Sequence, residues 1–124
     1  MKPVALIVAA TLALAISAPA MAQQPFELDD LDADRTSGGI EIEFEYDGSA
    51  CEEVGAAEVG AQVGGTLSVN FPIKATAEVC TRQIVEIDVE QTVAADAGVT
   101  RVDVTLTSPD GIVIGAGSAD VDND

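Results

Sequence analysis

The segment 40–46 alternates strictly between large apolar and acidic side chains, in the order Ile40, Glu41, Ile42, Glu43, Phe44, Glu45, Tyr46. Successive side chains of a β-strand point to opposite faces, so this period of two puts the apolar groups on one side and the carboxylates on the other. An α-helix would mix the two kinds around its circumference. The segment therefore predicts a half-buried strand that ends at Asp47 and Gly48.

The same period of two recurs in the segments 67–79, 85–90 and 102–107. Pro72 interrupts the first of these and predicts an edge position or a break, because proline has no N–H to donate. Ser108 to Gly111 has the composition of a type I turn that leads into a return strand. No segment shows a sustained apolar period of 3.6 residues, which is the signal of an amphipathic helix.

Six or seven short strands in about 80 residues predict an all-β fold, specifically a small antiparallel β-sandwich. An immunoglobulin-like topology is compatible with this pattern, although the chain has no Trp for the hallmark Cys–Trp–Cys arrangement. An open barrel is the alternative architecture. The glycine-rich segment 51–65 predicts a loop with at most one short strand, because repeated glycine disfavours a helix.

Residues 1–22 have the pattern of a secretory signal peptide. Lys2 precedes an uncharged run from Val4 to Ile16, and Ala20 and Ala22 occupy the −3 and −1 positions of a cleavage site. The run is shorter than the roughly 20 residues that span a bilayer. We therefore expect a mature chain that starts at Gln23, is periplasmic or secreted, and is not inserted in a membrane.

After the signal peptide, the composition divides the chain into three further parts. Residues 23–39 are dominated by acidic and turn-forming side chains and predict a flexible acidic leader. Residues 40–119 carry the strand pattern and predict the β-sandwich domain. Residues 120–124 predict a frayed acidic tail.

Cys51 and Cys80 are an even pair in a chain that we expect in an oxidising compartment, which predicts one structural disulfide. Their spacing differs from the C-x-x-C of redox-active pairs. The chain also has no His to complete a soft-metal site.

The formal net charge of −17 excludes several functions. It grows to −18 when residues 1–22 leave, because they contain Lys2 and no acid. Such a charge repels phosphate backbones, so we expect no nucleic-acid binding. Without His, the usual Ser–His, Cys–His and His–metal sites cannot be built. A substrate cleft would normally recruit aromatic side chains, and the chain has only one Tyr and three Phe. We therefore expect no enzymatic activity.

One spacing of carboxylates resembles that of a calcium loop. Asp30, Asp32, Asp34 and Glu41 occupy positions 1, 3, 5 and 12, where a hard cation takes its oxygen ligands. Position 6 is Arg35 where such a loop needs Gly, and its charge would oppose the ion. These four residues are the candidate metal ligands, and calcium is the only cofactor that we consider.

Two acidic stripes follow the polar faces of predicted strands, and their members are Glu41, Glu43, Glu45, Glu86, Asp88 and Glu90. Like charges directly opposite each other in a sheet repel. We therefore expect the stripes to lie apart or to face Lys74, Arg82 or Arg101. They predict either a solvated surface that discourages aggregation or a docking surface for a basic partner.

Together these features predict an exported, soluble, disulfide-linked β-module without catalytic activity. We expect a structural or protein-binding role, with a partner protein in the cell envelope or outside the cell. The alternatives are a calcium-binding acidic module, a subunit of a surface fibre that assembles through strand edges, and a small inhibitor of a secreted enzyme.

Overall fold

The computed structural model describes residues 24–80 and 83–123. Within these residues the chain forms nine strands and no helix: β1 (Phe26–Glu27), β2 (Asp29–Thr36), β3 (Gly39–Ser49), β4 (Glu52–Val54), β5 (Glu58–Val63), β6 (Thr66–Ala75), β7 (Ile84–Val93), β8 (Arg101–Thr107) and β9 (Val113–Asp122). The predicted all-β class is confirmed. The predicted signal peptide and Arg82 lie outside the described residues. In the described part of the chain, no helix is long and apolar enough to cross a membrane.

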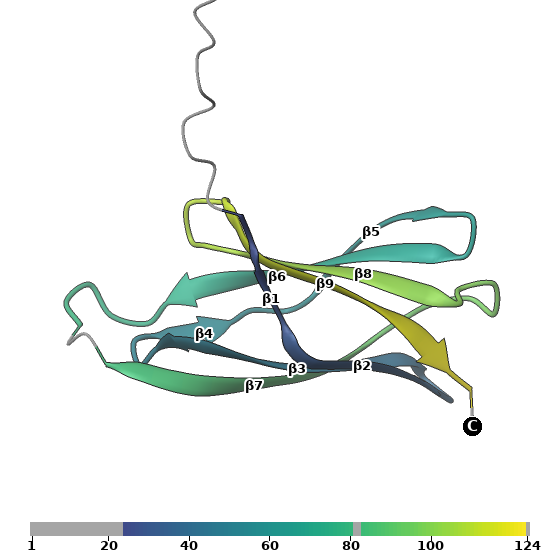
Figure 1. Ribbon diagram of the computed structural model, residues 1–124, viewed down its shortest axis with the longest axis horizontal. Coiled ribbons are helices and arrows are strands. Elements are labelled where there is room, and N and C mark those ends of the chain that lie inside the picture. Colours follow the sequence, from purple (N-terminus) through teal and green to yellow (C-terminus); the bar gives the residue numbers. More distant parts are fainter. Residues whose placement is uncertain (1–23, 81–82, 124) are drawn as a thin grey trace, which may run out of the picture.

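The strands follow one hydrogen-bonded path, β4–β6–β8–β9–β2–β3–β7, with β1 added beside β9 and β5 beside β6. This path folds into two layers, one with β2, β3 and β7 and the other with β6, β8 and β9 (Figure 1). The two ends of the path nearly meet. The Gln91 side chain of β7 donates to the Gly55 carbonyl at 2.9 Å and accepts from the Ala57 N–H at 2.8 Å, just beyond β4.

Strand pairing is mixed, whereas the sequence predicts an antiparallel arrangement. The pairs β1–β9, β2–β9 and β6–β8 are parallel. The pairs β2–β3, β3–β7, β4–β6, β5–β6 and β8–β9 are antiparallel. Parallel neighbours need a crossover, and β7 supplies the one between β6 and β8 by running in the other layer. Period-two patterning defines faces and leaves the choice of neighbour open.

The chain ends differ from the expected flexible leader and frayed tail. Most of the leader forms β1 and β2; Leu28 between them and Ala33 of β2 are buried, with 7% and 1% of their surface exposed. At the other end, β9 continues to Asp122 and buries Val121. The reason is pairing, because β2 lies between β3 and β9 and gains ladder hydrogen bonds on both edges. Because β2 is paired on both edges, one small buried side chain, Ala33, is enough to hold it against the core.

The core lies between the layers and contains three of the four aromatic side chains, whereas Phe26 is 40% exposed at its margin. Phe44 of β3 packs edge-on against Phe71 of β6 with ring centroids 5.0 Å apart. Phe44 also contacts Tyr46, which stacks on Phe26 of β1 at 6.2 Å. The expected alternation on β3 is confirmed, because Ile40, Ile42, Phe44 and Tyr46 are all at most 2% exposed.

Pro72 neither breaks β6 nor lies at a free edge. β5 pairs with residues 66–70 of β6, β4 pairs with residues 73–75, and Pro72 falls between them. Its carbonyl accepts the Gly55 N–H at 2.7 Å. Since the N–H and C=O of one strand residue point to the same edge, the missing N–H of Pro72 falls in this gap, where no ladder bond is lost. The glycine-rich segment 51–65 thus holds two short strands.

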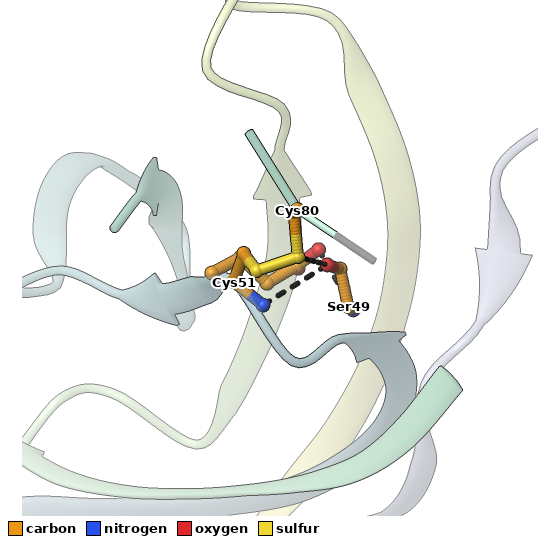
Figure 2. The surroundings of a disulfide bond; sticks show 4 residues. Ser49, Cys51 and Cys80 are labelled. Atoms are coloured by element: carbon orange, nitrogen blue, oxygen red, sulfur yellow. Dashed lines mark hydrogen bonds between the residues drawn. A yellow bond between two sulfur atoms is a disulfide. The ribbon is translucent and has the colours of Figure 1, made fainter. Parts of the chain in front are cut away.

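The predicted disulfide between Cys51 and Cys80 is confirmed, with a Cα–Cα distance of 5.9 Å. It joins the turn after β3 to the connection between β6 and β7. Ser49 supports it, because its Oγ accepts the Cys51 N–H at 3.0 Å and lies 3.6 Å from Cys80 Sγ (Figure 2). The Cys51 carbonyl also accepts the Thr76 N–H at 2.8 Å.

Replacing both cysteines, as Cys51→Ala with Cys80→Ala, is expected to lower the free energy of unfolding. The loop of sequence separation 29 gives a loss of roughly 3–4 kcal/mol, because the unfolded chain regains the entropy of the open loop. Urea denaturation followed by circular dichroism measures it. The wild-type protein under reducing conditions is the control and should show the same loss. A loss below about 1 kcal/mol would contradict a stabilising role.

Candidate functional site

Ten carboxylates cover the outer side of the layer formed by β2, β3 and β7, and we call this surface the acidic face. Alternation places them there, because the residues between them turn inward on each strand. Of the four on β3, Glu41, Glu43 and Glu45 are half-buried between the two flanking strands, and Asp47 is exposed opposite Glu86. The members of the acidic face are Asp30, Asp32, Asp34, Glu41, Glu43, Glu45, Asp47, Glu86, Asp88 and Glu90.

The two predicted stripes lie directly opposite each other, so the expectation that they lie apart is wrong. β3 pairs with β7 in a register that places Glu43 against Glu90 and Glu45 against Asp88. On the other side of β3, Asp32 lies opposite Glu43, which puts three carboxylates in one row across the sheet. Like charges in such positions repel. The rows form because the apolar side chains on the inner faces of the same strands pack in the core. This packing leaves the acids on the outer face, opposite one another.

Basic side chains do not offset this charge in the described part of the chain. Arg35 of β2 turns to the opposite side, where its Nη2 donates to the Val99 carbonyl at 2.6 Å and its Nε donates to Asn123 Oδ1 at 3.1 Å. Arg101, one of the three basic residues considered as possible partners of the stripes, forms exposed ion pairs with Asp103 and Asp120 in the other layer. Lys74 lies on β6, also in the other layer.

An irregularity in β2 brings one more carboxylate onto the acidic face. The register between β2 and β3 shifts between Asp29 and Asp32, and Asp30 adopts a left-handed conformation with φ of 49°. Asp is among the few residues that tolerate this conformation. Beside it, the surface is hollowed into a depression of about 280 Å³ lined by Asp30, Asp32, Glu43, Glu45, Asp88 and Glu90, with Phe44 and Val89 at its floor.

Crowding of the carboxylates raises the pKa of two glutamates on β3. A hydrogen bond with Asp30, together with the charges of Glu86 and Asp88 and partial desolvation, raises the pKa of Glu45 to about 7. A hydrogen bond with Glu90, with partial desolvation and the charges around it, raises the pKa of Glu43. In each pair a shared proton relieves the repulsion. Glu45 therefore takes up a proton close to neutral pH.

The four candidate calcium ligands lie on a two-stranded hairpin and not within one turn. Asp34 and Glu41 are directly paired, while Asp32 pairs with Glu43 and Asp30 contacts Glu45. The structure instead groups carboxylates across strands. The oxygens of Asp34, Glu41 and Glu43 lie within 4.8 Å of one another, and so do those of Glu45, Glu86 and Asp88. The first triplet contains two of the four predicted ligands together with Glu43, and the second contains none of the four.

Comparison of the chain with models of protein families, with curated proteins and with solved structures found no match. The acidic face is therefore interpreted from its own residues.

Each acidic stripe can be recognised in the sequence, but the contact between the two stripes cannot. The partner of β3 is β7, about forty positions along the chain, and nothing local selects it over β8. One feature of the sequence indicates that the two stripes belong to a common acidic surface. The segments 40–46 and 85–90 both carry an acid at every second position, and both lack a basic residue.

Protonation of Glu45 is expected to make stability fall as the pH rises. Its pKa is raised in the folded state, so the folded protein binds this proton more tightly than the unfolded chain. The resulting stabilisation is complete below the ordinary value of 4.5 and is lost as the pH rises through about 7. Thermal melting between about pH 5 and about pH 8 should thus show a falling midpoint. Glu45→Gln should flatten this slope, and an unchanged slope in that variant would contradict the assignment.

Proposed function

We propose that this chain is an exported, non-catalytic β-module whose acidic face binds a cationic surface of a partner protein in the cell envelope or outside the cell. One observation carries the proposal. The acidic face gathers ten carboxylates on three adjacent strands, and no basic side chain in the described residues pairs with them. An ordinary solvated surface disperses charges of both signs.

The electrostatics of the acidic face favour a cationic occupant. Glu43 lies opposite acids on both neighbouring strands, and the repulsion between these like charges lowers the stability of the folded protein. A partner that brings Lys or Arg side chains to these rows relieves the repulsion as it binds. Charge of one sign over one surface also accelerates encounter with an oppositely charged partner, especially at low salt.

A non-catalytic role agrees with how the chain uses its few aromatic groups. Phe44 and Phe71 are fully buried in the core, and Tyr46 is 2% exposed. The depression on the acidic face is lined mostly by carboxylates, which suits the docking of charged groups. The predicted signal peptide supports the exported location, as does the disulfide, which persists in oxidising compartments.

Neutralising one strand of the acidic face is expected to weaken the binding of a lysine-rich peptide. The variant Glu86→Gln, Asp88→Asn and Glu90→Gln keeps the side-chain shapes and should bind about tenfold more weakly at low salt, since it removes three of the six exposed carboxylates of the face. Fluorescence anisotropy with a labelled peptide measures the affinity at about 20 mM and about 500 mM NaCl, where screening should abolish most of it.

The matched control neutralises three exposed acids elsewhere, as Glu27→Gln, Glu78→Gln and Asp110→Asn. It has the same net charge as the first variant and should bind like the wild type. Equal weakening in both variants would show that only total charge matters and would contradict a defined docking face.

Calcium binding is the second candidate function, and the two carboxylate triplets favour it. Each triplet offers three oxygens within 4.8 Å of one another, which is compatible with the several oxygen ligands that calcium takes. In this proposal Asp34, Glu41 and Glu43 hold one ion, and Glu45, Glu86 and Asp88 hold the other.

Calcium at millimolar concentration is then expected to raise the melting temperature relative to chelator, because a ligand that binds only the folded state stabilises it. The combined variant Glu43→Gln and Glu45→Gln should lose this increase, while the control variant at Glu27, Glu78 and Asp110 should keep it. No increase in the wild type would remove the calcium candidate and leave the cationic partner.

A further inference from the structure

β7 is the last strand of its layer and has one unpaired edge. It pairs with β3 over its full ten residues without any shift of register, and no other described strand pairs with it. In Figure 1 it runs along the lower margin of the molecule. Up to Gln91, whose side chain bonds to the Gly55 carbonyl and the Ala57 N–H beyond β4, its unpaired edge is therefore long and regular, which is the kind of edge that accepts a further strand.

The pairing pattern identifies the backbone groups at this edge. The Ala50 N–H donates to the Gln83 carbonyl at 3.2 Å, and this pair continues the register of Ser49 opposite Ile84. Hydrogen-bonded pairs alternate along an antiparallel ladder. The odd-numbered residues of β7 therefore bond to β3. The N–H and C=O groups that point to the free edge belong to the even-numbered residues, which are Ile84, Glu86, Asp88, Glu90 and Thr92.

The free backbone groups and the acidic side chains thus belong to the same residues. Glu86, Asp88 and Glu90 each present a donor and an acceptor to the edge and a carboxylate to the outer face. An added strand would place every second side chain beside these carboxylates. The alternate side chains would face inward, toward a depression of about 340 Å³ between β7 and β4 that Val54 and Ile87 help to line.

The unpaired edge of β5 differs in both respects. β5 is shorter, and its register with β6 shifts between Val59 and Gln62. Its only charged side chain is Glu58. An irregular, nearly uncharged edge gives neither a continuous ladder nor a preference for charge.

We propose that the free edge of β7 binds an extended cationic segment of the partner protein, which adds to the sheet as a strand with Lys or Arg at alternate positions. This inference rests on the proposed function and specifies how the partner binds. Charge selects the occupant, because a second copy of β7 would set three carboxylates against three others. A cationic strand satisfies the backbone groups and the acidic side chains together.

The probe is a ten-residue peptide of alternating Lys and Thr, blocked at both ends, which places all lysines on one side when extended. Amide hydrogen exchange of the complex should show new protection at Glu86, Asp88 and Glu90. In the free protein these amides should exchange faster than those of Ile87 and Val89, which bond to β3. The same peptide with N-methyl groups on the backbone amides that face β7 should bind about tenfold more weakly, because it keeps the charge and loses the donors.

Two variants at one position separate charge from backbone pairing. Asp88→Asn removes the carboxylate and keeps the N–H, whereas Asp88→Pro also removes the N–H that faces the free edge. The ladder with β3 does not use that N–H, so the proline variant should keep its fold. It should bind the peptide about tenfold more weakly than Asp88→Asn. If the proline variant fails to fold, the N-methylated peptide still tests the pairing.

The outcomes distinguish this inference from the function on which it rests. Binding without amide protection, and with equal affinity for the N-methylated peptide, overturns strand addition and leaves the acidic docking face. Absence of binding by either peptide overturns both. Protection of the same amides in concentrated protein without peptide identifies a second copy as the occupant and overturns the cationic one.

Discussion

The packing of Phe44 on Phe71 between the two layers is the interaction on which the rest of the structure depends. It fixes which side of β3 faces inward, and the acids on β3 then have only the outer side left. Burial of a Phe side chain stabilises by roughly 1.5–3 kcal/mol, whereas a directly opposed charged pair in a sheet contributes less than about 1 kcal/mol. The core therefore determines the register, and the carboxylates are held together as a consequence.

The sequence was sufficient to predict which face of each strand is buried, but it was insufficient to predict which strands pair with one another. Alternation at 40–46 and 85–90 correctly identified buried and exposed side chains, and the cysteine pair correctly identified the disulfide. The positions of Glu43 opposite Glu90 and of β1 and β2 beside β9 depend on long-range pairing, which local patterns do not encode. Repulsion alone argued for separating the stripes, and it is outweighed by apolar packing on the far side of the same residues.

The acidic face has a charge that depends on its surroundings. The hydrogen bond between Glu45 and Asp30 and the one between Glu43 and Glu90 each hold a proton more tightly than an isolated carboxyl does. A proton, a cation and a lysine side chain all relieve the same repulsion. They therefore compete for the acidic face, and a partner that binds by charge should displace the proton from Glu45 when it docks.

The parallel contact of β1 and β2 with β9 joins the first strands of the chain to the last one. During synthesis, residues emerge in order from the amino end. β2 therefore has only one of its two neighbours until about eighty further residues have been made. The sheet that bears the acidic face is thus completed only when β9, near the carboxyl end, is available for pairing.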